Sequence, residues 1–367
     1  MMLETTFPFG FEASTTFYLV LYVLTWVLHV AFMGYVLAGS FYVAWATVFP
    51  GKSLPPRSEQ PICELLREWI PFMLSGAITA GVAPLLFVQI IYRQEFYTAN
   101  LLLGWRWLMV IPVLIVAFYL LYLLKSRAVA TWSLAARAIT VAGVAGSFLF
   151  VAFCWTTNHL LGINRDGWAN SYETGTVVAA ALPLVLRLLI WVAGVFPVMC
   201  LIVAWQLAGR DSMSSSSDTP VSPPARALAR MAIGGLLVAV ISGTAYATQL
   251  PDSVRQHLLG AAGQAWLYAV GAGVVLQIFG WVHMLRQREF CHRTLSVISV
   301  ASLVTLTGTA SLREIVRVSQ VDLLSIVQNC RSAADVGGFA LFVVCLVLNI
   351  LLVGVCLLLT RTGLRRQ

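Results

Sequence analysis

The sequence predicts an all-α membrane protein: a bundle of nine transmembrane helices with its N-terminus outside and its C-terminus in the cytoplasm. The first observation is composition, since the 367 residues are 59% hydrophobic and only 10% charged, whereas a soluble domain carries about 25% charged residues. The second is that apolar stretches of about 20 residues, long enough to cross a hydrocarbon layer of ~30 Å as a helix, recur along the chain. The third is the placement of the basic residues among the loops.

The apolar stretches follow one another at short intervals from the N-terminal region to the C-terminal region. The nine predicted spans are residues 17–49, 70–92, 101–124, 134–160, 176–208, 227–250, 262–285, 294–314 and 336–360. The first and the fifth are longer than the hydrocarbon layer requires, so we expect them to tilt or to project beyond it.

The 23 lysines and arginines are distributed unequally between the loops on the two sides of the membrane. With the N-terminus placed outside, the outer loops and helix ends hold only Arg93, Arg106, Arg165, Arg255, Arg313, Arg317 and Arg331. Arg187 lies within a span, and all the other basic residues lie on the inner side. This positive-inside bias predicts the orientation. Such a chain is expected in the inner (cytoplasmic) membrane of a bacterium, and its net charge of +8 does not indicate nucleic-acid binding.

One low-complexity segment, "DSMSSSSDTPVSPP" at residues 211–224, interrupts the apolar pattern. Its composition is typical of a flexible linker. We therefore divide the chain into a five-helix bundle at 1–208, a cytoplasmic linker at 209–226 and a four-helix bundle at 227–367. The remaining loops are short and leave no room for a soluble catalytic domain. Chemistry would have to use residues inside or at the rim of the membrane, or belong to a partner.

The seven cysteines contain no C-x-x-C pair. This spacing argues against a disulfide framework, a zinc site, an iron–sulfur cluster and the C-x-x-C-H attachment of a c-type haem.

His29 is the most unusual polar residue, because it lies about a dozen residues into the first span, in "TWVLHVAFMGYVLAGSFYVAW". Small residues follow it at Gly34 and Ala38, and small residues let a helix or a flat macrocycle approach closely. A neutral imidazole in a dry bundle is a good axial ligand for haem iron. A histidine bonded to a carbonyl of a neighbouring helix would explain the residue equally well, so both interpretations stay open.

Two further charged features lie in the spans. Glu314 and Arg317, in "GTASLREIVRVSQ", are three residues apart and share a helix face, as a ligand with its partner or as an interfacial ion pair would. Arg187 lies about 11 residues, or ~17 Å, into the fifth span. We expect it to pair with a buried anion, either Glu314 or a haem propionate. His159, at the outer end of the fourth span, is expected to make ordinary interfacial hydrogen bonds.

Together these features resemble subunit I of the cytochrome bd-type quinol oxidases. That family has nine helices in the same orientation, a haem-ligating histidine in the first span within a stretch like "LHVAFMGYVLAGS", and a haem-ligating glutamate in the eighth within an E-x-x-R pattern. His29, Glu314 and Arg317 match those positions. The segment "EWIPFMLSGAITAGV", at 68–82, is similar to the family's second span. The resemblance implies that His29 and Glu314 are iron ligands, and that Arg317 and Arg187 offset haem propionate or carboxylate charge.

The chain departs from the family at the second haem. The residues from Arg187 to Ile190 stand where the family has a histidine in its fifth span, and the outer half of the seventh span has no methionine. The outer loop that contributes to quinol binding in the family shrinks to "QLPDSVRQHLLGA", and the third span has no carboxylate for proton transfer. The low-spin haem site is therefore expected to be absent.

Three functions remain open from the sequence. The first is a haem b-binding electron-transfer subunit of a respiratory complex, an oxidoreductase component that works with a quinol or an external cytochrome and with at least one further membrane subunit. The second is a haem-free structural or anchoring subunit, in which the same polar residues join the helices. The third, a secondary transporter, is less favoured because the prolines within the spans show no repeated arrangement.

Overall fold

The computed structural model describes residues 3–49, 60–126, 129, 131–175, 182–211, 223–287, 289–336 and 338–364. The regular structure of these residues is helical, with no strand among them. The helices are α1 (Ala13–Val48), α2 (Pro61–Ile91), α3 (Arg93–Leu103), α4 (Trp105–Leu108), α5 (Val110–Lys125), α6 (Leu134–Ile163), α7 (Trp168–Thr174), α8 (Leu182–Asp211), α9 (Pro223–Thr248), α10 (Asp252–Leu259), α11 (Gln264–Gln287), α12 (His292–Val318), α13 (Leu323–Asp335) and α14 (Gly338–Leu364), with a short 3-10 helix at Arg165–Gly167.

Eight helices of the described part are long and apolar enough to cross a membrane. They are Ala13–Val48, Pro61–Ile91, Trp105–Lys125, Leu134–Ile163, Leu182–Arg210, Pro224–Thr248, Gln264–Gln287 and His292–Val318. In none of them is more than half of the most apolar window buried inside the protein. Much of their apolar surface therefore faces outward, as a lipid solvent requires. The chain is an all-α bundle of apolar helices of the kind that spans membranes.

The ninth predicted span coincides with α14, a helix of 27 residues. Its crossing of the membrane and the orientation of the whole bundle stay predictions. The first eight predicted spans each coincide with one candidate helix, with edges shifted by several residues. The first part of the fifth predicted span, residues 176–181, lies outside the described residues.

The third span is broken where the sequence predicts one continuous helix from residue 101 to 124. Gly104 adopts φ +57° and ψ −128°, which ends α3 at Leu103 before α4 begins. A side chain at this φ would clash with the backbone, so only glycine adopts the conformation readily. The membrane-crossing part therefore runs over Trp105–Lys125, and α3 turns aside.

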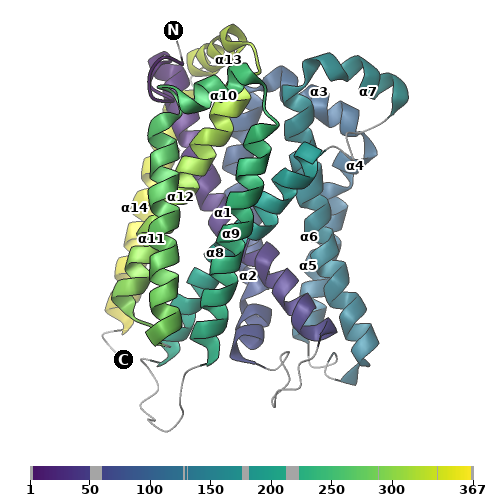
Figure 1. Ribbon diagram of the computed structural model, residues 1–367, viewed down its shortest axis with the longest axis vertical. Helices are drawn as coiled ribbons and strands as arrows, with labels where there is room; N and C mark the ends of the chain where they lie inside the picture. The colour runs from purple at the N-terminus through teal and green to yellow at the C-terminus, as the bar shows by residue number, and fades with distance from the viewer. Residues whose placement is uncertain are drawn as a thin grey trace.

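The bundle has two distinct ends (Figure 1). The short helices α3, α7, α10 and α13 lie at the end where α1 begins, and α14 ends at the opposite side. We name these the upper and lower ends, as they stand in Figure 1. The sequence predicts that the upper end faces outward.

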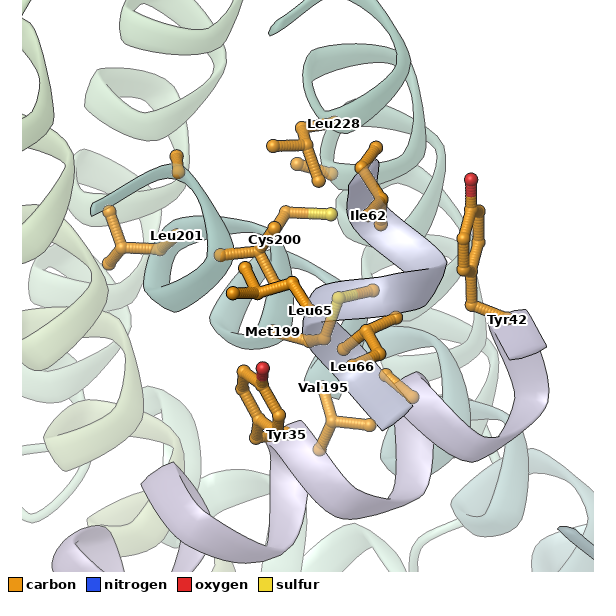
Figure 2. Packing of buried hydrophobic residues seen from close by; sticks show 14 of the residues in the cluster. Tyr35, Tyr42, Ile62, Leu65, Leu66, Val195, Met199, Cys200, Leu201 and Leu228 are labelled. Atoms are coloured by element: carbon orange, nitrogen blue, oxygen red, sulfur yellow. The ribbon is translucent and has the colours of Figure 1, made fainter. Parts of the chain in front are cut away.

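The largest buried cluster lies in the lower half and joins α1, α2, α8 and α9. Figure 2 shows Leu65 and Leu66 of α2 beside Met199 and Cys200 of α8. Helix α1 approaches α2 closely at Gly39, where an added Cβ would meet Leu66 Cδ2 at 3.0 Å. At Gly34, one of the small residues after His29, an added Cβ would meet Val195 Cβ of α8 at 3.3 Å, so this glycine lets α1 and α8 pack closely.

The predicted linker begins and ends inside helices. Helix α8 continues to Asp211 and α9 begins at Pro223, and residues 212–222 lie outside the described part. The buried cluster contains residues from both sides of the linker, such as Met199 and Leu228. The division at 1–208, 209–226 and 227–367 stays a prediction.

Candidate functional site: a buried arginine cluster beside His29

Glu314 lies near the upper end of α12 and is fully buried. The Tyr92 hydroxyl donates to Glu314 Oε2 at 2.8 Å, and Arg313 Nε donates to Oε1 at 2.9 Å. Arg317 Nη1 lies 4.0 Å from Oε2, which confirms that the two members of the E-x-x-R pattern form an ion pair. Both carboxylate oxygens are therefore occupied by partners from the protein itself.

The two neighbouring arginines are held by aromatic side chains of α1 and by Tyr92. The Arg313 guanidinium lies over the Trp26 ring at 4.2 Å from the ring centroid, and Arg317 lies over Tyr92 at 4.3 Å. Both arginines donate to the Tyr22 hydroxyl, at 3.2 and 3.3 Å. Cation–π contacts of this kind are strongest away from water, so they help to compensate burial of the guanidinium groups.

Arg187 of α8 is buried, with 6% of its surface exposed. The sequence predicts a carboxylate or a propionate as its partner, but the structure gives it Tyr246 of α9: Arg187 Nη1 donates to that hydroxyl at 3.0 Å, and the guanidinium lies 5.1 Å from the ring centroid. Arg187 Nε has no partner among the described residues. Arg187 also experiences the charges of Arg313 and Arg317, so the three guanidinium groups form one cluster.

His159 belongs to the same region and corrects an expectation. Its position near the end of a span predicted ordinary interfacial hydrogen bonding, yet the side chain is only 7% exposed and Nε2 has no partner in the described part of the chain. It experiences the charges of Arg187, Arg313 and Arg317. The expectation was wrong because the candidate span continues to Ile163 and His159 faces arginines of α8 and α12 inside the bundle.

We define the arginine cluster as Arg187, Arg313, Arg317 and Glu314. The cluster holds three guanidinium groups and one carboxylate, which pairs with Arg313 and Arg317, while Arg187 contacts Tyr246. The neighbouring His159 adds no negative charge. Buried charges of one sign are costly unless they are compensated. The tyrosine hydroxyls and aromatic rings compensate only in part, so the cluster is suited to an additional anionic group.

His29 lies one turn below Trp26 on the same face of α1, since Tyr22, Trp26 and His29 follow the i, i+4, i+7 spacing. Its Nδ1 lies 2.9 Å from the carbonyl oxygen of Ala77 in α2. The imidazole packs against Gly81, where an added Cβ would lie 3.0 Å from Nδ1. The carbonyl bond predicted by one of the two interpretations is therefore present, and it makes Nδ1 the protonated nitrogen.

Nε2 of His29 has no hydrogen-bond partner among the described residues. A ligand histidine typically donates its second ring N–H to a carbonyl or a carboxylate, which fixes the tautomer and the ring orientation. The Ala77 bond is such an arrangement, so it does not exclude a ligand at Nε2. His29 fits an axial haem ligand on this chemistry, while both oxygens of Glu314 already accept hydrogen bonds, from Tyr92 and Arg313.

The structure thus joins Glu314, Arg317 and Arg313 directly and places Arg187 within electrostatic reach. His29 lies one helical turn along α1 from Trp26, the residue whose ring contacts Arg313. Within the described ranges, no group of three or more His, Cys, Asp or Glu side chains is placed to hold a metal ion. The sequence reasoning missed Arg313, Tyr22 and Tyr92, although the i, i+4, i+7 series from Tyr22 to His29 was readable.

The comparisons with known proteins identify no relative: no protein-family model, no curated protein and no solved structure matches the chain. The residues of this site therefore carry the functional argument.

Proposed function

We propose that the chain is an integral-membrane haem b-binding electron-transfer subunit of a respiratory complex, a divergent relative of cytochrome bd oxidase subunit I. The observation that carries the proposal is the state of His29 in a candidate membrane helix: Nδ1 is held by the Ala77 carbonyl, and Nε2 has no hydrogen-bond partner within the described part of the chain. A neutral imidazole fixed in this way is prepared to bind iron.

The arginine cluster supports the same assignment. Arg187, Arg313 and Arg317 exceed the negative charge of Glu314, and a haem b would bring propionate carboxylates that offset this excess. Arg313 reaches the His29 side of the bundle through its contact with Trp26. In this proposal His29 holds the iron and the arginines hold the propionates, and the bound group would supply reversible one-electron transfer.

Glu314 has a different role in the geometry than the resemblance implies. Since Tyr92 and Arg313 occupy its two oxygens, the contacts favour Glu314 as the counter-ion of the arginines. Its role as a second iron ligand stays a prediction.

The same occupied oxygens favour one alternative function. In a haem-free structural or anchoring subunit, the arginine cluster and the His29–Ala77 bond would serve only to join α1, α2, α8, α9 and α12. Polar side chains that form hydrogen bonds between membrane helices hold those helices together. This alternative predicts no bound chromophore.

For the haem-binding subunit, partners follow from the small size of the loops. We propose that a further membrane subunit packs against the outward-facing apolar helix surfaces, and that a quinol or an external cytochrome exchanges electrons at the upper end. The membrane is proposed to be the bacterial cytoplasmic membrane, with the upper end outward, because the basic residues gather at the lower end.

The test is the pyridine haemochrome spectrum of the purified protein. We expect the spectrum of non-covalent haem b in the native chain and its loss in His29→Ala. The matched control is His292→Ala, since His292 is exposed at the lower end. A band of equal intensity in His29→Ala would refute the ligand assignment, and a native protein without any band would favour the structural subunit.

A further inference from the structure

A second site is present in the lower half, between α1, α2, α5 and α6. A small pocket of about 20 Å³, large enough for about one water-sized group and partly open to the outside of the bundle, lies there, far from the arginine cluster. Its lining consists of Ser40, Val43, Arg67, Ile70, Leu121, Leu124, Val141 and Val144. The walls are thus apolar except for one hydroxyl and one guanidinium group.

Ser40 supplies a buried donor without a partner. The side chain is 3% exposed, and Oγ makes no hydrogen bond to any described residue. Other helical hydroxyls nearby donate to the carbonyl four residues earlier, as Thr47 does to Val43 at 2.8 Å and Thr140 to Ala136 at 2.9 Å. A buried hydroxyl left unpaired costs free energy, so an acceptor in the cavity would be favourable.

The basic residues around the cavity are also uncompensated. Arg67 lines it directly, and Arg137 lies on the face of α6 that carries Val141 and Val144; its Nε is buried and has no partner among the residues that the structure describes. No carboxylate of a described residue forms an ion pair with either guanidinium group. Glu68, next to Arg67 in the sequence, pairs instead with Arg210 at 2.8 Å.

We propose that the opening of this pocket binds the phosphate of an anionic phospholipid, with one oxygen reaching into the pocket toward Ser40. Arg67 and Arg137 bind the phosphate oxygens, and Ser40 donates to an oxygen of the same headgroup region. Basic pockets between membrane helices bind acidic headgroups in this way. The acyl chains remain in the bilayer, against α5 and α6, whose Tyr119 and Ile139 are 71% and 73% exposed. This site is independent of haem binding at His29.

The experiment measures thermal unfolding of the full chain in neutral detergent as phosphatidylglycerol, phosphatidylcholine or inorganic phosphate is added. We expect phosphatidylglycerol to raise the midpoint and the other two to have little effect. In the double variant Arg67→Gln and Arg137→Gln, the affinity for phosphatidylglycerol should fall by about tenfold or more, since each guanidinium contributes a charge-assisted hydrogen bond. Ser40→Ala should weaken it by a smaller factor.

The matched control is Arg230→Gln with Arg286→Gln, which removes the same charge from exposed positions at the same end. The control should keep the native response to phosphatidylglycerol. An equal loss in the control would show only general attraction to acidic lipid and overturn the site. Stabilisation by inorganic phosphate as large as that by lipid would show a free-anion site and overturn the lipid assignment. If the double variant is too unstable to purify, Ser40→Ala and Arg67→Gln alone decide the question by the same comparison.

Discussion

Removing the charge of Glu314 tests the physical basis of the arginine cluster. In Glu314→Gln, the side chain keeps its shape and the Tyr92 hydroxyl still has an amide oxygen to donate to. The partner of Arg313 loses its charge, and Arg187, Arg313 and Arg317 are left without any carboxylate. Arg317 and Glu314 are almost completely buried, and the Arg313 side chain is 13% exposed, so water screens the repulsion poorly.

Breaking a buried pair by removing one partner costs ~3–5 kcal/mol in the free energy of unfolding, because the remaining charge is uncompensated. The matched control is Glu68→Gln, whose pair with Arg210 is about half exposed, at 53% and 52% of the two side chains. Surface pairs of this kind contribute about 0–1 kcal/mol. The two substitutions are chemically identical, and the sites differ in burial and in the number of partners that the carboxylate has.

The assay is unfolding of the purified protein in mixed micelles by added sodium dodecyl sulfate, followed by circular dichroism. We expect a large loss of stability for Glu314→Gln, a small one for Glu68→Gln, and partial recovery when Arg313→Gln is added to Glu314→Gln, since the double variant removes part of the excess charge. If Glu314→Gln costs no more than Glu68→Gln, the cluster is not an electrostatic network and the reasoning is refuted.

Two further predictions concern packing and thiol chemistry. Gly273→Ala places a Cβ 2.4 Å from Thr305 Oγ1 and 2.9 Å from the Ala301 carbonyl, so it should push α11 away from α12. We expect it to lower the free energy of unfolding by about 1–3 kcal/mol in the same assay. Gly271→Ala is the control, since an added Cβ there would meet open space and should cost little. Hydrogen bonds from Thr294 lower the pKa of the exposed Cys291 thiol. Alkylation of Cys291 by iodoacetamide should therefore already be fast at a pH below the usual pKa of a cysteine thiol. Burial raises the pKa of Cys330 to about 11, so that thiol should react slowly over the same pH range.

Much of the site could be read from residue types, but its pairing could not. His29, Glu314, Arg317 and Arg187 stand out because polar groups are rare and costly in membrane spans. Their partners are Tyr92, Tyr246 and Trp26, which sequence patterns treat as ordinary apolar or interfacial residues. Only the packing of distant helices shows that Arg187 binds a tyrosine instead of a carboxylate, and that Arg313 belongs to the buried network.

The sequence by itself determined the helical membrane class and the approximate ranges of the candidate spans, because a hydrocarbon solvent forces apolar composition and internal backbone hydrogen bonding on every crossing segment. The tertiary structure decided which polar groups meet, where Gly104 breaks the third span, and that His159 is buried near arginines of α8 and α12. These outcomes depend on the angles and depths at which helices far apart in the chain pack together. Local spacing carries no information about such angles, since each helix presents the same residues along its own axis whatever lies beside it.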